Sequence, residues 1–390
     1  MHTPKKILFF INNTAFFVSH RLPIAEKLIS EGHDVILVTG KGGSDDMENI
    51  AIKKLANYPI SHFRLAFKAS SMNPLIEIYS IFQLIYYLLK IKPSVLHCVS
   101  PKSVLYGGIA AFFSGTKFVV LAVSGMGHLF SDSKNKPNIF KIILKKSYMF
   151  LFKLILLVNR NIKVIVQNQD DFASLTKLRA IPDSNIFLIK GSGVNLKKYN
   201  DVSIEAKQKI VLLVGRMLKE KGVYQFIEAA KKLKIANPDW SFVLIGAAGY
   251  DNPSSISSSE LDEIKKLGII DWIGHVDDTS PYIKKSSIMC LPSYREGMPK
   301  VLLEAAAAGC AIVTTDVPGC REAVEDNVTG LLVPLHNQDK LNEAILFFIK
   351  NTKLRNSFGS RAMRHAVLNY GIESVVDKHL EIYNMSFNKS

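Results

Sequence analysis

The chain has 390 residues, 48% of them hydrophobic, which is enough to fill the cores of two domains of about 100–200 residues each. Residues 1–195 carry a net charge of +13, from 24 Lys and Arg against 11 Asp and Glu, whereas residues 196–390 carry only +2. Four cysteines without a C-x2-C spacing or a neighbouring histidine cluster argue against a disulfide framework and a zinc site, so we expect a reduced cytoplasmic protein.

Short apolar runs of the buried-strand type alternate with helical segments along the whole chain. This alternation predicts an α/β fold of two doubly wound, parallel-sheet, Rossmann-like domains. The predicted strands of the first half are residues 7–11, 34–39, 62–66, 95–99, 118–121 and 164–167. Those of the second half are residues 210–214, 242–246, 269–273, 288–291, 311–314 and 331–334. A polar stretch near 199–209 marks the predicted domain boundary.

We expect no signal peptide, because Lys5 and Lys6 precede only a five-residue apolar run that is typical of a first strand. Asn12-Asn13-Thr14 follows that strand. Ser19 is then the predicted N-cap of a helix that carries Leu22 and Ala25.

The segment 133–169 contains eight Lys and Arg and no acidic residue, interleaved with aromatic and aliphatic residues. A basic, aromatic-rich helix of this kind suits an anionic membrane surface, at about 1 kcal/mol per cation. No uncharged run approaches the roughly 20 residues of a spanning helix, and Glu77 interrupts the apolar stretch 74–89. We therefore expect a peripheral protein on the cytoplasmic face of the membrane. The alternative is that these faces pack on the sheet and the lysines are merely solvated.

Two cations follow the predicted strand 210–214. Gly215 and Arg216 end that strand, and Lys221 comes five residues later, before a helical run. Ligands bind at the carboxyl edge of open α/β sheets. Arginine and lysine together suit a diphosphate, which suggests that protein cations can replace a divalent metal ion.

Two carboxylates bracket a predicted helix start after the strand 288–291. Glu296 lies in the loop, and Glu304 lies in a predicted helix 301–308 with Pro299 in its first turn. Eight helical residues span about 12 Å, more than the roughly 5–9.5 Å between the carboxylates of a glycoside hydrolase. We therefore expect Glu296 and Glu304 to contact two separate parts of one long ligand. The helix start between them is a predicted phosphate seat, formed by Gly297, Met298, Pro299, Lys300 and Val301.

These motifs resemble the family 4 retaining glycosyltransferases of the GT-B fold. The matching elements are Gly215-Arg216 with Lys221, the E-x7-E spacing from Glu296 to Glu304, and Ala308-Gly-Cys-Ala-Ile-Val-Thr-Thr-Asp316 with Gly319, Glu322 and Gly330-Leu-Leu-Val333. Phe16-Phe-Val-Ser-His-Arg-Leu-Pro23 and Ser71-Met-Asn-Pro74 look like members that build bacterial surface polysaccharides on lipid carriers.

The resemblance implies two domains that face each other across a cleft. Residues 1–200 would bind the acceptor, and residues 201–371 would bind a nucleotide-diphosphate sugar, with UDP as the expected nucleotide. The helix 372–390 would return to the first domain. Glu296 would contact donor-sugar hydroxyls, Glu304 the ribose, and Arg216 and Lys221 the diphosphate. Transfer of a hexosyl or N-acetylhexosaminyl group would be retaining and metal-independent, with no cofactor.

The sequence of the first domain contains fewer clear candidates for substrate-binding or catalytic residues. Ser19, His20 and Arg21 are candidate ligands of the lipid-linked acceptor, although Asn12-Asn13-Thr14 replaces the glycine-rich turn that is common in the family. In many relatives a catalytic histidine in the turn after the fifth strand lies beside the donor sugar, and His128 is the nearest match for it in this sequence. His97, on the strand 95–99, is the alternative.

Other functions remain open at this point. A sugar-nucleotide epimerase of the same fold would share the nucleotide site but need no acceptor. A non-catalytic basic membrane-binding protein would explain the charge of the first half but not the ordered motifs of the second. A nicotinamide dehydrogenase is disfavoured because no G-x-G-x-x-G follows the first strand. The expected partner of the basic surface is an anionic membrane and not nucleic acid.

Overall fold

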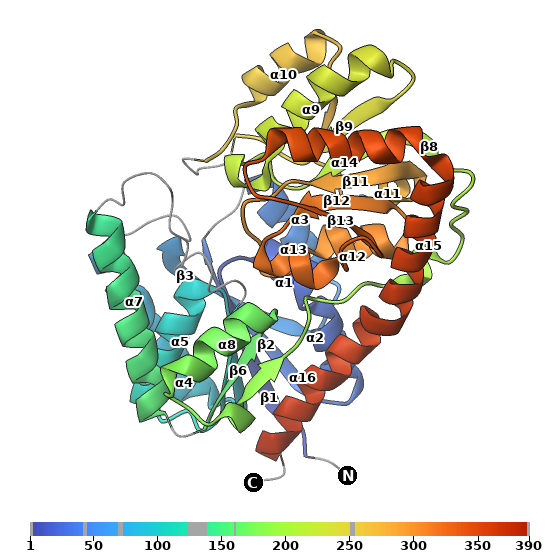
Figure 1. The fold of residues 1–390 in the computed structure, drawn as a ribbon. Helices are drawn as coiled ribbons and strands as arrows, with labels where there is room; N and C mark the ends of the chain where they lie inside the picture. Colours follow the sequence, from blue (N-terminus) through green and yellow to red (C-terminus); the bar gives the residue numbers. More distant parts are fainter. Residues whose placement is uncertain are drawn as a thin grey trace. The chain divides into compact units, whose positions relative to one another are not determined.

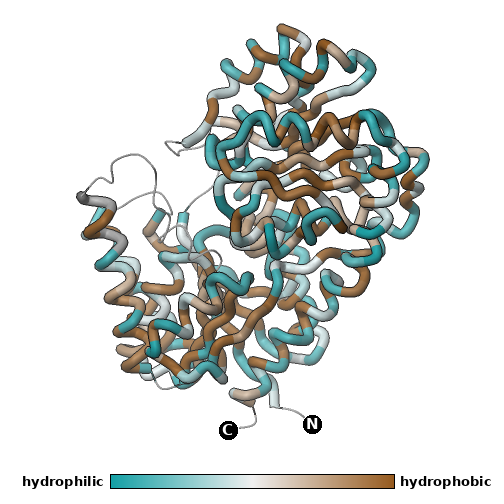
Figure 2. Tube along the Cα trace, viewed as in Figure 1, coloured by the Kyte–Doolittle hydropathy of each residue, from teal (hydrophilic) through white to brown (hydrophobic). Residues whose placement is uncertain are grey.

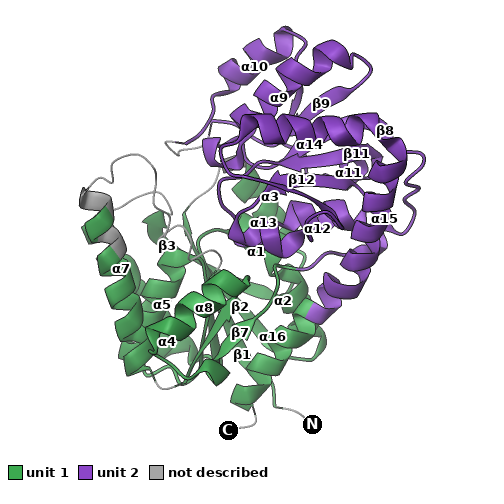
Figure 3. Ribbon diagram, in the orientation of Figure 1, with its two compact units in different colours: residues 1–192, 375–390 green, residues 193–374 purple. Residues whose placement is uncertain are grey.

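The computed structural model describes residues 3–41, 45–68, 73–123, 139–159, 161–249 and 254–387. The chain forms two compact units (Figure 3), one made of Met1–Ser192 with Val375–Ser390 and the other of Gly193–Ser374. Each unit is built on one parallel sheet with helices packed against it (Figure 1). The predicted α/β class with two doubly wound parallel sheets is therefore confirmed.

The first unit contains a seven-stranded sheet in the order β3-β2-β1-β4-β5-β6-β7, with all neighbouring strands parallel. Residues of β1 alternate between two cores. Leu8 and Phe10 join the cluster under α4, α5 and α7, whereas the ring of Phe9 packs against Phe17 and His97. The strands are β1 (Lys6–Ile11), β2 (Asp34–Lys41), β3 (Ile60–Lys68), β4 (Val95–Val99), β5 (Val119–Val123), β6 (Ile162–Val166) and β7 (Ile186–Leu188).

Helices cover both faces of this sheet. By length and composition alone, α4 is long and apolar enough to cross a membrane, although only 17% of its candidate span is buried. The helices are α1 (Thr14–His20), α2 (Leu22–Ser30), α3 (Asp45–Leu55), α4 (Pro74–Ile91), α5 (Pro101–Ser114), α7 (Ile139–Val158) and α8 (Gln169–Leu178), with the short η1 (Asp183–Asn185) and the returning α16 (Ile372–Phe387).

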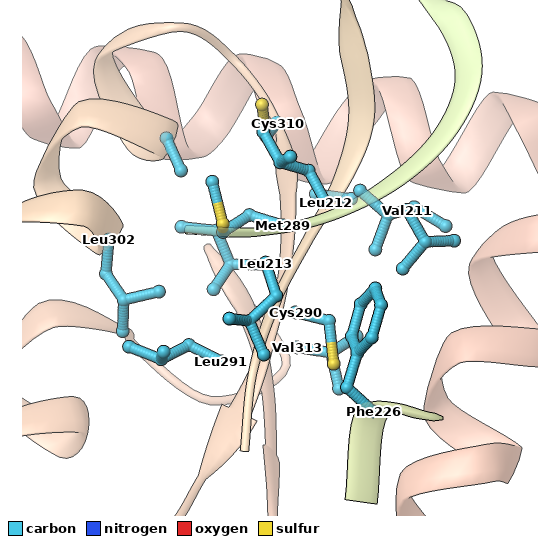
Figure 4. Packing of buried hydrophobic residues seen from close by; sticks show 14 of the residues in the cluster. Val211, Leu212, Leu213, Phe226, Met289, Cys290, Leu291, Leu302, Cys310 and Val313 are labelled. Carbon is cyan, nitrogen blue, oxygen red and sulfur yellow. The ribbon is translucent and has the colours of Figure 1, made fainter. Parts of the chain in front are cut away.

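The second unit contains a six-stranded parallel sheet in the order β10-β9-β8-β11-β12-β13. Its core is formed by strand residues and by helix residues such as Phe226 and Leu302, and Figure 4 shows this packing at close range. The strands are β8 (Gln208–Val214), β9 (Ser241–Ile245), β10 (Asp271–Gly274), β11 (Ser286–Leu291), β12 (Ala311–Thr315) and β13 (Gly330–Val333).

Helices also flank the second sheet. They are α9 (Val223–Ala236), α10 (Ser258–Lys266), α11 (Ser280–Lys285), α12 (Lys300–Ala307), α13 (Pro318–Ala323), α14 (Gln338–Lys350) and α15 (Thr352–Asn369), together with the short η2 (Leu196–Tyr199) and η3 (Lys219–Lys221).

All twelve predicted strands are present, with ends that shift by a few residues. The structure adds the short strand β7, which the sequence analysis did not predict. The predicted basic helix is α7, and its continuous helix ends at Val158, before β6.

Candidate active site

The two sequence motifs of the second half follow neighbouring strands. β8 and β11 are adjacent in the sheet, and the strand order reverses at this pair. Gly215 and Arg216 follow β8, while Pro292 to Glu296 follow β11. In doubly wound sheets, the crevice at the carboxyl ends of such a strand pair is where ligands bind. The fold thus places the cationic and the acidic motif on the same edge.

The loop after β8 packs directly on the end of β11. Gly222 has a φ of +73°, and a Cβ there would lie 2.1 Å from the carbonyl oxygen of Pro292. Only glycine allows both this backbone conformation and this close approach. The contact fixes the short helix η3, and therefore Lys221, beside the loop that carries Glu296.

Lys221 and Glu296 form an ion pair, with 2.6 Å between Lys221 Nζ and Glu296 Oε1. Both side chains are mostly buried, at 20% and 9% exposure. Arg216 follows the same strand, and its side chain is exposed. Lys221 and Glu296, predicted as contacts to different parts of the donor, are therefore brought together, and Arg216 lies on the same loop as Lys221.

Ser293 is a site residue that the sequence analysis missed. Its fully buried Oγ lies 2.6 Å from Glu296 Oε1 and 3.1 Å from the carbonyl oxygen of Glu220. The hydroxyl and Lys221 thus meet the same carboxylate oxygen. The Ser-x-x-Glu spacing immediately after a strand could have indicated this contact, because a serine often bonds a group three residues later.

The loop between the two carboxylates is tightly held. Met298 and Pro299 are buried, and α12 begins at Lys300, one residue earlier than predicted. Pro299 occupies the N-cap position and not the first turn, and no side chain caps the helix. Pro299 has no amide hydrogen, so the predicted phosphate seat, residues 297–301, lacks a backbone donor at this position.

Gly319 supports this loop from the start of α13. A Cβ at Gly319 would lie 2.5 Å from the carbonyl oxygens of both Glu296 and Gly297. Any larger residue must therefore displace the backbone next to the carboxylate, which gives a physical reason for the glycine in the sequence motif.

Glu304 lies inside α12, in the interior of the predicted helix, and Val301 precedes it in the first turn. Its side chain is 19% exposed, and Lys300 Nζ lies 3.6 Å from Glu304 Oε1. Burial raises the pKa of this carboxyl, and the nearby Lys300 opposes the shift. Burial raises the pKa of Tyr199 as well, and the charge of Glu304 adds to that shift.

The N-terminal candidates behave differently from the prediction. Ser19 is not the N-cap of the helix that carries Leu22 and Ala25, because that helix is α2 and its N-cap is Arg21, without a side-chain hydrogen bond. Ser19 belongs to the preceding helix α1, which Asn13 caps by accepting a hydrogen bond from the Phe16 amide at 2.8 Å. Ser19 instead lies in the last turn, where its Oγ donates to the carbonyl of Ala15 at 2.9 Å. The ring of His20 stacks on Phe16 at 4.2 Å.

Arg21, the third acceptor candidate, is buried and only 2% exposed. Its Nη1 donates to the carbonyl of His20 at 3.0 Å, and burial lowers its pKa to about 10. It belongs to a buried cluster with His97, His379 and Tyr383. His97 Nδ1 lies 2.5 Å from the hydroxyl oxygen of Tyr383, so this ring packs against α16.

His128 and the Ser71-Met72 part of the N-terminal motif lie outside the described residues. Among the residues that the structure does describe, no group of three or more His, Cys, Asp or Glu could hold a metal ion. The four cysteines are buried and free.

Comparison with known families identifies both halves of the chain. Residues 6–159 match the family described as "Glycosyl transferase 4-like", and residues 196–365 match "Glycosyl transferases group 1". The chain belongs to the glycosyltransferases that combine these two domains.

Relatives of similar length support this assignment. The chain is 27% identical, over 96% of its length and 97% of the relative, to N,N'-diacetylbacillosaminyl-diphospho-undecaprenol alpha-1,3-N-acetylgalactosaminyltransferase from Campylobacter jejuni. It is also 27% identical, over 82% of the chain and 81% of the relative, to UDP-Gal:alpha-D-GlcNAc-diphosphoundecaprenol alpha-1,3-galactosyltransferase from Escherichia coli.

Solved structures establish the fold. Sucrose-phosphate synthase from Thermosynechococcus elongatus aligns with a TM-score of 0.77 over 99% of this chain and 100% of that chain, at 18% identity. Anabaena Alr3699/HepE in complex with UDP and glucose aligns with a TM-score of 0.74 over 98% and 100%, at 16% identity. The fold is GT-B, and the protein is a glycosyltransferase.

Proposed function

We propose that this enzyme transfers a sugar from a UDP-linked donor to a saccharide on a polyprenyl diphosphate, with retention of configuration, during assembly of a surface polysaccharide or glycan. The supporting observation is the near full-length match to a relative named for a diphospho-undecaprenol acceptor. The second relative is named for UDP-Gal and a diphosphoundecaprenol acceptor. Both names specify alpha linkages, which retention produces from an alpha-linked nucleotide sugar.

The donor would bind in the second unit. Arg216 and Lys221 would meet the diphosphate, whose two negative charges match a guanidinium and an ammonium group from one loop. Lys221 already bonds Glu296 at 2.6 Å, and its three hydrogens allow it to keep that bond while it contacts a phosphate oxygen. The amides of Gly297, Met298 and Lys300 at the start of α12 would add donors to the same anion.

Glu296 and Glu304 would hold the two ends of the donor. Glu296, fixed by Lys221 and Ser293, would accept hydrogen bonds from the sugar hydroxyls. Glu304, farther along α12, would accept them from the ribose, as acidic residues do in dinucleotide-binding folds. The order of Glu296 in the loop before α12, the start of that helix and Glu304 inside it suits a ligand in which sugar, diphosphate and ribose follow one another.

The chemical step would use the donor's own phosphate as the base. The bond between the anomeric carbon and the phosphate oxygen breaks, and the acceptor oxygen bonds to the same face of that carbon. The acceptor's proton passes to the departing phosphate oxygen. Arg216 and Lys221 stabilise the charge that accumulates on the diphosphate, which is usually the largest contribution of such a site.

The acceptor would bind in the first unit, which carries most of the positive charge. Ser19 and His20, at the end of α1, are the accessible part of the N-terminal motif, and Arg21 would support them through its bond to the His20 carbonyl. The enzyme would act as a peripheral protein at the cytoplasmic face of the membrane, where polyprenyl-linked saccharides are accessible.

A transfer assay tests this proposal. The purified protein is incubated with individual UDP-sugars and a short-chain prenyl-diphosphate saccharide, and the lipid product is identified by mass and linkage. We expect one donor to yield a saccharide longer by one alpha-linked sugar, with equal yield after EDTA treatment. Conversion of the donor to its epimer without acceptor would identify an epimerase instead. A beta-linked product would disprove retention.

A further inference from the structure

Three helices of the first unit form a continuous layer on one face of its sheet (Figure 3). α4 packs against α5, and α5 packs against α7. Their inner sides are buried in a shared core, for example through Leu84 and Leu88 of α4 and Phe152 and Ile155 of α7. The outer side of this layer, here called the α4–α5–α7 face, carries many of the large hydrophobic side chains that are exposed among the described residues.

The outer side of α4 is hydrophobic along its whole length. Its exposed residues recur at spacings of four and three, which places them on one stripe of the helix. Phe82, in the middle of the stripe, is 65% exposed. The stripe consists of Leu75, Tyr79, Phe82, Tyr86 and Leu89.

α5 and α7 also carry exposed hydrophobic side chains. Phe113 near the end of α5 is 67% exposed, and Phe150 in the middle of α7 is 68% exposed. Of the 25 large hydrophobic side chains that are exposed among the described residues, 15 lie on these three helices. Figure 2 shows hydrophobic residues recurring along α7. A patch of this kind on one layer marks an interaction surface and not ordinary scattered exposure.

The charges on this face have one sign. Lys90 of α4 and Lys146 and Lys153 of α7 are exposed. The single acidic residue in the three helix sequences is Glu77, and it is held by Lys102 at 2.8 Å and by the Tyr106 hydroxyl at 2.6 Å. Exposed lysines beside aromatic and aliphatic residues, without exposed acids, are complementary to an anionic lipid surface.

The contacts of α4 also decide how it would meet a membrane. Although α4 is long and apolar enough to span one, its Leu84 and Leu88 are buried in the core, and Glu77 is bonded to α5. A spanning arrangement would break these contacts. If α4 instead lies in the plane of the membrane–water interface, these core contacts are kept and the outer stripe is buried in lipid. Tyr79 and Tyr86 would then lie at the level of the headgroups, where tyrosine rings are enriched in membrane proteins.

We propose that the α4–α5–α7 face inserts its exposed hydrophobic side chains into an anionic lipid bilayer, with the lysines at the headgroups. The binding is then hydrophobic as well as electrostatic. This inference rests on the proposed function in one respect, because a lipid-linked acceptor presented in the same bilayer would meet an enzyme already held at its surface.

Flotation with vesicles of phosphatidylglycerol and phosphatidylethanolamine tests the proposal on the full chain. The triple variant F82S/F113S/F150S should bind at least tenfold more weakly, and the residual binding should disappear at high salt. The matched control is I235S/L368S, which removes two side chains of the second unit that are 85% and 83% exposed. This control should bind like the wild type.

Two further measurements distinguish membrane insertion from self-association and from a failure of the proposed function. Light scattering without lipid reports whether the face is covered by a second copy, and a dimer that the triple variant dissociates would overturn the proposal. Transfer to a water-soluble short-chain acceptor should be unchanged in the triple variant, while transfer to an acceptor embedded in vesicles should fall about tenfold. Equal vesicle binding by the folded triple variant and the wild type would refute membrane insertion, whereas absent transfer by the wild type would refute the proposed function alone.

Discussion

Lys221 and Glu296 are joined by an ion pair of 2.6 Å although they lie 75 positions apart and come from loops that follow two neighbouring strands. Each side chain is mostly buried. The pair therefore organises the site before a donor arrives, because both charged groups are held where the diphosphate and the sugar are proposed to meet.

Replacing Lys221 by Ala should lower turnover by about 10²-fold, the scale of losing one charge-stabilising donor. It should also destabilise the fold by about 1–3 kcal/mol, because the mostly buried Glu296 loses its cationic partner. The measurements are steady-state kinetics and chemical unfolding. The double variant K221M/E296Q should regain stability but not activity. Normal turnover of K221A would show that Lys221 does not stabilise the leaving group.

Replacing Ser293 by Ala should raise the donor KM by about tenfold or more, since hydrogen bonds to charged groups contribute about 1.5–3 kcal/mol. The effect on kcat should be smaller, because Ser293 acts through the position of Glu296. The control is S287A, which replaces a buried serine of β11 whose Oγ donates to the carbonyl of Gln208 at 2.6 Å. If S293A and S287A change the donor KM equally, the positioning role is wrong.

The cluster around His379 predicts a loss of stability in mild acid. Burial lowers the pKa of His379 to about 3, and the charge of Arg21 contributes to this shift. The unfolded chain, with a histidine pKa of about 6.5, binds the proton first. Between the two pKa values, the free energy of unfolding falls by about 1.4 kcal/mol for each unit of decreasing pH. Above a pH of about 6.5, His379 is neutral in both states and does not change the stability.

The variant H379Q removes this titration. Between pH 7.5 and 5 it should lose about 2 kcal/mol less stability than the wild type. Thermal unfolding at both values measures the difference, and H275Q, which replaces a partly exposed histidine of the second unit, is the control. If the stability of H379Q falls with decreasing pH as much as that of the wild type, protonation of His379 does not cause the loss.

Much of the fold could be predicted because strand patterns are local. Continuous apolar runs such as 210–214 and 288–291 identify buried parallel strands without any knowledge of their neighbours. β7 was missed because its three residues, Ile186–Leu188, are too few to show a pattern. Ser19 was wrongly predicted to cap the helix that carries Leu22 and Ala25, because the short preceding helix α1, capped by Asn13, was not predicted and already contains Ser19.

The relationships that could not be predicted are those between distant parts of the chain. The burial of Arg21 depends on α16, which supplies His379 and Tyr383 from more than 350 residues away. The motif resemblance assigned Lys221 and Glu296 to different parts of the donor, and nothing local indicates that they bond each other. Ser293 carried a local indication, but only the fold shows that its hydroxyl meets the carboxylate.

The returning helix α16 also has a consequence for biosynthesis. Its residues from Val375 onward complete the core of the first unit, through the contact of Tyr383 with His97 and that of Ser386 with the Ser94 carbonyl. A ribosome delivers this helix only after all of the second unit. The first unit therefore keeps part of its hydrophobic interior exposed until the second unit has been synthesised, and exposed apolar surface of this kind promotes aggregation during folding.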